Sequence, residues 1–566
     1  MFMDGQSSRL DIFSYYKMVL LILFSTLGLI LFIYFRAENV FEEGKKLYYF
    51  PLGIYTMLVF LSAIFSEYKR VAFFGFIDRY EGGLVLIAYS VIMFLAMHVA
   101  KDEKAIKQIF RFLLGSAFII ALIGAFQYFG VDYFKSKLFL NLVTPKSLHD
   151  QISEIKSIFP EHTIASTLFN SNYVGSYMAM LLPINLLLLI HTKKIVQKGL
   201  LLIPLILIIL NWIGCQSRAG IIGGVLALLI IAFMFRRKLL VNKVIAIVVT
   251  LLLCGSVFAV NFISGGDLFK KVASMISLEG KNSTNNSIVN NIIQDIVDIK
   301  MEHEKASIIT RQGTLNISLP SGELKIFDER NMDIDIIPKD NIVYFNDVRF
   351  DKFKLNTNPD AGLIEIYYNE FKLVNILFTK DGLKSNSNIW MTYRGNNRIE
   401  TFGPSEMESL GSNRGYIWAR TIPLLKKTIF LGHGPDTFPL YFPQYDYLGK
   451  LRMYQNGGIF VDKPHNLYLQ TAVNTGVLSL LALLVAFGIY IVTSLRIYWN
   501  ESFSTFLPVA GLSCLSAFLG YTASGIFNDS VISISPVFWV LFGLGAGINS
   551  MLYKNNLNNN SVKSHL

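Results

Sequence analysis

The chain has 566 residues, of which 52% are hydrophobic and only 16% are charged. Soluble domains carry about 25% charged residues, so this composition excludes an ordinary soluble protein and predicts a membrane protein. The formal net charge of +11 would also suit a nucleic-acid-binding protein. The lysines and arginines lie mostly in short loops between apolar runs, however, so membrane topology explains much of the charge and we expect no nucleic-acid partner.

Runs of about 20 apolar residues, long enough to cross the hydrocarbon core of a bilayer, recur along the chain. The first run lacks a basic start and a small-residue cleavage site, so we interpret it as a retained helix and not as a signal peptide. We predict spans near residues 16–35, 47–65, 82–100, 109–129, 168–191, 199–215, 219–235, 240–263, 467–494, 504–527 and 531–552. The expected fold class is mainly α, a polytopic membrane protein with about 11–12 transmembrane helices. Its parts would be an N-terminal bundle at 1–263, C-terminal helices at 465–552 and a disordered cytoplasmic tail at 553–566.

The stretch 264–464 differs in composition from both membrane parts. It begins with a polar linker at 281–291, and alternating segments such as GTLNISL then predict short strands separated by Gly, Asn and Asp turns. We expect a β-rich insert at about 290–402, followed by a short interfacial helix at about 416–430. The whole stretch would form one large extracytoplasmic loop.

Basic loops indicate the orientation in the membrane. The loops KDEKAIKQIFR, HTKKIVQK and RRKLLVNK are dense in positive charge and alternate so that all three lie on one side, the cytoplasm. The polar loops around Arg79, Arg218 and His465 then face outward together with the β-rich insert. The sequence therefore predicts any active site on the extracytoplasmic face.

Metal-ligand patterns are weak in this sequence. The three cysteines, Cys215, Cys254 and Cys514, lie in or at the ends of apolar segments and give neither metal-ligand spacing nor a disulfide framework. His433 and Asp436 lack a third ligand nearby and are better interpreted as part of a turn. We expect no metal site and no cofactor.

Arg218 lies in a very tight turn, QSRAG, between two apolar helices, where a charged residue is costly. One interpretation is a snorkelling arginine that fixes the end of a helix. The other is an anion site, because the small neighbours Ser217, Ala219 and Gly220 allow close helix packing and would let an anionic group reach the guanidinium.

Two other helix entrances carry polar residues that could bind a substrate. Arg79, Tyr80 and Glu81 precede the glycines that open a helix, although Arg79 could instead pair with a neighbouring carboxylate. Asn170 and Asn172 stand at the entrance to another helix. Asparagine there usually caps the helix, but it can also hold a sugar hydroxyl.

Arg414 follows a polar linker, and His465 directly precedes an apolar run, where it could simply mark the end of a transmembrane segment. Outward arginines with one histidine also suit a phosphate or diphosphate at the membrane surface. Guanidinium offers paired donors that match phosphate oxygens. Histidine can remove a proton from an acceptor hydroxyl near neutral pH. The sequence thus predicts a metal-independent diphosphate site around these residues.

Five motifs together resemble the O-antigen ligase/polymerase family of bacterial membrane glycosyltransferases, and are most similar to members from bacteria without an outer membrane. The motifs are HNLYLQTAVNTGVLSL, SRAG, RYEGG, FNSNYVGSYMAMLLP and RGYIW…LGHGPDTF. The resemblance covers nearly all of the helical part and leaves out the β-rich insert. It implies a helical GT-C-like fold and the transfer of a glycan from an undecaprenyl-diphosphate carrier, with inversion and without a metal. The acceptor would be a glycan, a protein or a wall polymer, and the reaction would take place on the outer face of the cell membrane.

The same resemblance implies roles for single residues. Arg218 and Arg414 would hold the diphosphate and stabilise its leaving charge, and His465 would activate the acceptor hydroxyl with Asn466 in support. The RYEG feature, which contains Arg79, would contribute to substrate binding.

Other functions remain open at this point. A ligase and a polymerase use the same donor chemistry, so these motifs do not separate them. A flippase would place charged residues or helix breaks at mid-membrane, whereas the helix interiors here are almost free of ionisable residues. A membrane-anchored sensor would not need eleven spans.

Overall fold

The computed structural model describes residues 13–36, 45–143, 161–168, 170–236, 292, 294–302, 305–319, 323–358, 362–379, 382–385 and 399–564. Its first helices are α1 (Ser14–Arg36), α2 (Lys46–Ile64), α3 (Lys69–Phe74), α4 (Gly83–Val99), α5 (Glu103–Tyr128), α6 (Lys137–Val143), α7 (Ser171–His191), α8 (Ile195–Gly214) and α9 (Arg218–Met234). After the strands follow α14 (Leu410–Thr421), α15 (Phe438–Tyr441), α16 (Tyr447–Tyr454), α17 (Leu467–Asn474), α18 (Val477–Tyr498), α19 (Phe506–Ser524) and α20 (Ser535–Ser564).

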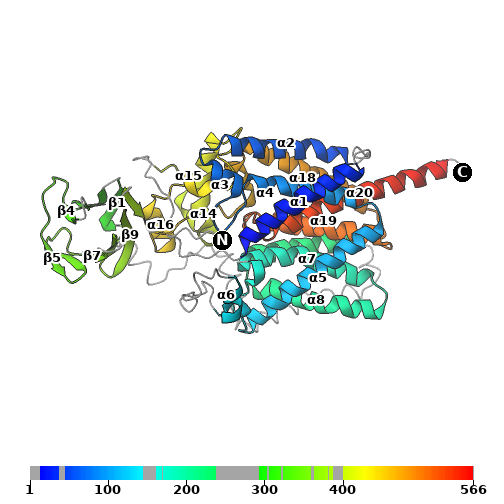
Figure 1. Ribbon diagram of the computed structural model, residues 1–566, viewed down its shortest axis with the longest axis horizontal. Helices are drawn as coiled ribbons and strands as arrows, with labels where there is room; N and C mark the ends of the chain where they lie inside the picture. Colours follow the sequence, from blue (N-terminus) through cyan, green and yellow to red (C-terminus); the bar gives the residue numbers. More distant parts are fainter. Residues whose placement is uncertain are drawn as a thin grey trace.

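Ten of these helices form one elongated bundle, and the strands lie beyond one end of it (Figure 1). Eight of the ten are long and apolar enough to cross a membrane, and α4 and α9 are shorter apolar helices. Ten of the eleven predicted spans coincide with these helices, and the eleventh, 240–263, lies outside the described residues. The expected fold class, a polytopic membrane protein with a β-rich insert, is confirmed.

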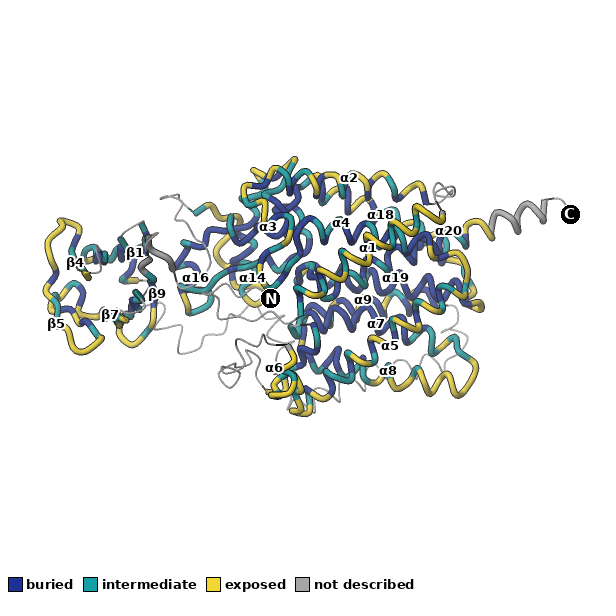
Figure 2. Tube along the Cα trace, viewed as in Figure 1, coloured by how far each residue is buried: buried dark blue, intermediate teal, exposed yellow. Residues whose placement is uncertain are grey.

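The centre of the bundle consists of α7, α9 and α19, which pack with almost no space between their backbones. Figure 2 shows these helices mostly buried, whereas α8 is largely exposed. Glycine makes the close approach possible, because a Cβ at Gly220 would lie 2.5 Å from the Cα of Gly175. A Cβ at Gly223 would likewise collide with the carbonyl oxygen of Gly520 and the hydroxyl of Ser524. This packing fixes the N-terminal end of α9, where Arg218 is the first helical residue.

The predicted single span at 467–494 is instead two helices, α17 and α18, separated at Thr475 and Gly476. Gly476 has a φ of 112°, which L side chains rarely adopt, so the chain turns here and starts a new helix. The segment before α15 packs into the break, because the Gly434 N–H donates to the Asn474 carbonyl and the Val477 N–H donates to the Thr428 carbonyl. Helix α17, which follows His465, is therefore separate from the long apolar helix α18.

The β-rich insert contains two antiparallel sheets in which strands that follow one another in sequence are neighbours. The first sheet has the order β1-β2-β3-β4 and the second has the order β10-β9-β8-β7-β6-β5. The strands are β1 (Ile296–Met301), β2 (Lys305–Thr310), β3 (Thr314–Ser318), β4 (Lys325–Phe327), β5 (Ile336–Lys339), β6 (Ile342–Phe345), β7 (Phe353–Asn358), β8 (Leu363–Tyr368), β9 (Phe371–Thr379) and β10 (Gly382–Ser385). Alternating burial along β8 shows the period of two that a half-buried strand requires.

Helix α16 connects the insert to the turn at the start of α14. Its residues Tyr447 and Leu451 belong to the hydrophobic core of the insert. At its other end, the Tyr454 hydroxyl donates to the Asn413 carbonyl, and the Asn413 amide donates to the Met453 carbonyl at 2.5 Å. The insert therefore reaches, through one short helix, the turn that precedes Arg414.

Two local predictions differ from the structure. The expected interfacial helix at 416–430 is α14, which becomes regular only from Arg414 and continues as a 3-10 helix over Ile422–Lys427. Proline at position 423, next to the end of α14, is compatible with this change because it lacks the N–H for a further hydrogen bond. The expected disordered tail at 553–566 is occupied as far as Ser564 by the end of α20.

Candidate functional site

The site predicted from sequence lies where loops from four parts of the chain meet at the strand-bearing end of the bundle. These are the loop before α4, the turn before α9, the external segment from α14 to α17, and the loop between α19 and α20. Successive long helices run in opposite directions, so these connections share one end (Figure 1). The basic loops after α4 and α7 are at the other end.

His465 faces a buried carboxylate from the loop between α19 and α20. Its Nδ1 lies 3.1 Å from Asp529 Oδ2, and the Asp529 side chain is only 1% exposed, against 32% for His465. Burial alone would raise the pKa of Asp529, but the charges of His465 and Lys463 outweigh burial and lower that pKa. A carboxylate this close to Nδ1 favours the tautomer that carries its proton on Nδ1, in which Nε2 is the nitrogen that can accept a proton.

The backbone around His465 is held in an uncommon conformation. His465 has a φ of 50°, in the left-handed region, and is followed by Asn466 as the N-cap of α17. The indole N–H of Trp418 donates to the Pro464 carbonyl at 2.9 Å. Such conformations cost on the order of 1–3 kcal/mol and persist only where neighbouring contacts enforce them, as these do on both sides of the histidine.

Arg218 and Arg414 bring two guanidinium groups together without an ion-pair partner among the described residues. Both side chains are partly exposed. Burial lowers the pKa of Arg414, and the positive charge of Arg218 lowers it further, whereas Asp529 acts in the opposite direction. Arg218 Nη1 donates to the Ser412 hydroxyl at 3.0 Å. Two neighbouring cations that lack counter-ions form a ready site for a dianionic group.

The turn before Arg414 consists of three successive residues with positive φ. Gly411, Ser412 and Asn413 have φ values of 63°, 62° and 67°. Only the first is a glycine, so the other two are strained by about 1–3 kcal/mol each. Since this turn positions Arg414 and also supplies the hydroxyl that binds Arg218, its conformation controls both guanidinium groups.

Arg79 is buried and paired, unlike the other two arginines. Its Nη2 lies 2.9 Å from Asp436 Oδ1, and its Nη1 donates to the Asp462 carbonyl and lies 3.8 Å from Asp462 Oδ2. Asp436 also accepts from the Phe76 N–H at 2.6 Å, so it fixes the loop that carries Arg79. These partners are far along the chain and no sequence pattern links them to Arg79.

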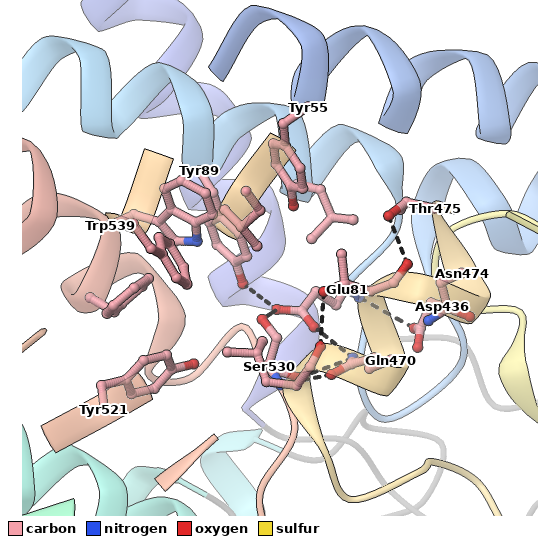
Figure 3. A pocket seen from close by; sticks show the side chains of 16 residues that line it. Tyr55, Glu81, Tyr89, Asp436, Gln470, Asn474, Thr475, Tyr521, Ser530 and Trp539 are labelled. Atoms are coloured by element: carbon pink, nitrogen blue, oxygen red, sulfur yellow. Dashed lines mark hydrogen bonds between the residues drawn. The ribbon is translucent and has the colours of Figure 1, made fainter. Parts of the chain in front are cut away.

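Tyr80 and Glu81 follow in the same loop but point into the molecule. The Tyr80 ring meets the Tyr15 ring edge-on, with 5.5 Å between centroids. The Glu81 carboxyl group is buried and lines a small cavity (Figure 3). Arg79, in contrast, contacts Asp462, which lies three residues before His465.

The three asparagines hold helix ends and loops. Asn170 caps α7 by accepting from the Asn172 N–H at 2.8 Å, and the Asn172 carbonyl accepts from the Asn528 amide at 3.2 Å. Asn466 caps α17, accepting from two backbone N–H groups, and its amide donates to the Ile526 carbonyl at 3.0 Å. Asn172 and Asn466 thus fasten the loop that contains Asp529 to two different helices.

Asp529 and Lys463 are site residues that the sequence reasoning missed. The Lys463 ammonium donates to the Tyr173 hydroxyl at 2.6 Å, and it is close enough to Asp529 for the two charges to interact. A signal for Asp529 was present, because it is the only acidic residue after Glu501 and lies between two apolar segments. Lys463 offered no comparable signal.

His433 and Asp436 are in separate contacts that agree with a turn. The His433 ring stacks on Tyr441 with 3.7 Å between ring centroids, while Asp436 binds Arg79. Within the described ranges, no group of three or more His, Cys, Asp or Glu side chains could hold a metal ion.

Residues 375–484 match the family model described as O-antigen ligase. This range contains the external segment with Arg414 and the His465 motif, together with the beginning of α18. The chain has no significant match among curated proteins or among solved structures.

Proposed function

We propose that this member of the O-antigen ligase/polymerase family transfers a glycan from an undecaprenyl-diphosphate carrier to an acceptor hydroxyl, on the outer face of the cell membrane. The observation that carries the proposal is the pair of unpaired guanidinium groups, Arg218 and Arg414, beside the His465–Asp529 pair. A lipid tail would stay in the bilayer while its diphosphate and sugar reach this end of the bundle. The family match supports ligase- or polymerase-type chemistry, and the cluster of charges supports the anionic donor.

His465 acts as the general base in this proposal. Its Nε2 removes the proton of the acceptor hydroxyl, and the acceptor oxygen attacks the anomeric carbon of the donor sugar. A new carbon–oxygen bond forms as the bond from that carbon to the diphosphate breaks, and the bonding electrons leave with the diphosphate. Attack from the face opposite to the leaving group inverts the configuration. Asp529 stabilises the imidazolium that forms.

Arg218 and Arg414 bind the diphosphate and neutralise the charge that grows on it as the bond breaks. Guanidinium groups can do this without a metal, which supports a metal-independent transfer. Arg79 acts at a distance in this scheme, since Asp436 and Asp462 already occupy its guanidinium.

The test uses purified protein, a defined lipid-linked oligosaccharide and candidate acceptors. We expect His465→Ala to abolish transfer and Arg218→Lys to lose most of it, because a point charge cannot replace a planar fork of donors. Arg236→Lys is the matched control, since Arg236 lies at the far end of α9 and, among the described residues, contacts the Phe233 carbonyl and the rings of Phe233 and Trp499. Normal turnover by His465→Ala would refute the catalytic assignment.

Product analysis distinguishes the two reaction types. Growth of long chains without an added acceptor would identify a polymerase that joins lipid-linked repeats, whereas transfer that requires a separate acceptor would identify a ligase. Glycan, protein and wall-polymer acceptors are each offered in turn.

A further inference from the structure

Glu81 is a buried acid whose carboxyl group contacts three segments, which are α4, α17 and the loop between α19 and α20. It lines a cavity of about 30 Å³ bordered by residues of α2, α4, α17, α18, α19 and α20, large enough for on the order of two water molecules. Figure 3 shows Glu81 at its centre, with Tyr89, Gln470 and Ser530 directed toward it. The cavity is too small for a sugar, so a role in contacting substrate does not fit this position.

All three neighbours of Glu81 donate hydrogen bonds to it. Oε1 accepts from the Tyr89 hydroxyl at 2.8 Å and from the Ser530 hydroxyl at 2.6 Å. Oε2 accepts from the Gln470 amide at 3.2 Å. One carboxyl group therefore ties α4 to α17 and to the loop between α19 and α20.

Two of these neighbours are directly connected to the catalytic pair. Ser530 is the next residue after Asp529, and its backbone N–H donates to Gln470 Oε1 at 2.8 Å. Gln470 lies on α17, the helix that begins just after His465. The segment with the carboxylate and the segment with the imidazole are thus joined to each other, and both are joined to Glu81.

Glu81 is suited to this role in its neutral form. Burial raises its pKa to about 8, against which hydrogen bonds from Ser530 and Tyr89 and the charge of Arg79 act only in part. The raised pKa favours the uncharged form, which places no second negative charge near Asp529. The titratable groups that face it from the surrounding elements are Tyr55, Tyr89, Tyr521, Arg79 and Asp436.

We propose that Glu81 is a positioning residue that holds Asp529 against His465 through Ser530 and Gln470, and does not bind substrate. The inference rests on the proposed function for its kinetic consequence. Its geometric content, the orientation of the His465 ring, can be measured separately. Loss of a group that orients a side chain in contact with the reacting atoms typically costs about 10–100-fold in activity.

The kinetic test compares Glu81→Ala with Glu81→Gln. We expect Glu81→Ala to lower kcat by about 10–100-fold with the KM for the lipid-linked donor unchanged, because Arg218 and Arg414 are not affected. Glu81→Gln keeps an oxygen that can accept from Tyr89 and Ser530, so we expect a loss of less than about fivefold. A raised KM with unchanged kcat would assign Glu81 to substrate binding and overturn the proposal. A folded Glu81→Gln as inactive as Glu81→Ala would overturn it too, because an ionised carboxylate would then be required.

A second measurement does not depend on activity. Diethyl pyrocarbonate modifies neutral imidazole, and the modified His465 peptide can be quantified by mass spectrometry. We expect faster modification at pH 7 in Glu81→Ala and in Ser530→Ala than in the wild type, because a ring that is no longer held against Asp529 reorients more freely and exposes its nitrogens to the reagent. The double variant should be no faster than either single variant, since both break one connection. Equal modification rates in all four proteins would overturn the inference, even if glycan transfer is observed. If the wild type shows no glycan transfer, the proposed function is refuted, and the modification rates still decide the role of Glu81.

Discussion

Replacing Asp529 by asparagine tests the proposed catalytic pair of His465 and Asp529. The change replaces one carboxylate oxygen by an amide nitrogen and leaves the size of the side chain almost unchanged. In the wild type a carboxylate oxygen of Asp529 lies 3.1 Å from His465 Nδ1, and this position favours a proton on that nitrogen. An asparagine amide would instead donate to Nδ1, so the ring would carry its proton on Nε2, the nitrogen that must accept one from the acceptor hydroxyl. Enzymes in which an orienting carboxylate is changed in this way lose about 10²–10⁴-fold in rate, and we expect a fall in kcat within that range.

The assay is single-turnover transfer from a lipid-linked donor, with donor binding measured separately. Donor affinity should change by less than about threefold, because Arg218 and Arg414 make no ion pair with Asp529. Asn528→Ala serves as a comparison for a loosened loop alone, since it removes the amide that binds the Asn172 carbonyl and the Ser176 hydroxyl but keeps the carboxylate of Asp529. If Asp529→Asn turns over within threefold of the wild type, the assignment of His465 as a base oriented by this carboxylate is wrong.

Further predictions concern stability and the insert. Gly223→Ala should destabilise the protein by about 1–3 kcal/mol, because its Cβ would meet the Gly520 backbone. Thermal unfolding in detergent would measure this loss, with Gly115→Ala as the control because the space around Gly115 is open. The pKa of Glu81 is raised from 4.5 to about 8, so the contribution of Glu81 to the free energy of unfolding should fall as the pH rises from about 4.5 to 8. Glu81→Gln should remove this fall, which denaturation midpoints measured across the same pH range would show. Deleting residues 292–385 should lower activity as well as thermal stability, because the deletion exposes Tyr447 and Leu451 of α16; unchanged activity with every acceptor would show that the insert does not act on the site.

Sequence reasoning located most of the fold because apolar length is a strong and local signal. Ten helices appear where hydropathy placed them, and strand alternation identified the insert. The break between α17 and α18 was missed because Gly476 lies in an otherwise apolar run, and only its φ of 112° and its contacts with the segment before α15 show its role. Hydropathy cannot detect a break that tertiary contacts stabilise.

The candidate site was predictable only in part. Arg218 and Arg414 could be selected as isolated charges at helix entrances, and the structure brings them together. The partners of His465 and Arg79 could not be selected, because Asp529 and Asp436 are separated from them by many residues and pairing depends on how the loops converge. The asparagines at helix entrances cap helices, as propensity alone suggests.

The left-handed turn at 411–413 has a consequence for how such a protein could change its acceptor. Ser412 in this turn accepts the hydrogen bond from Arg218, and Asn413 is held by Met453 at the end of α16. Residues at the start of α16 pack in the hydrophobic core of the insert. The β-rich insert meets the turn only through one short helix, so its strands could be altered without disturbing the packing of the bundle helices. If the proposed function holds, acceptor selection and donor binding would then be assigned to different parts of one chain.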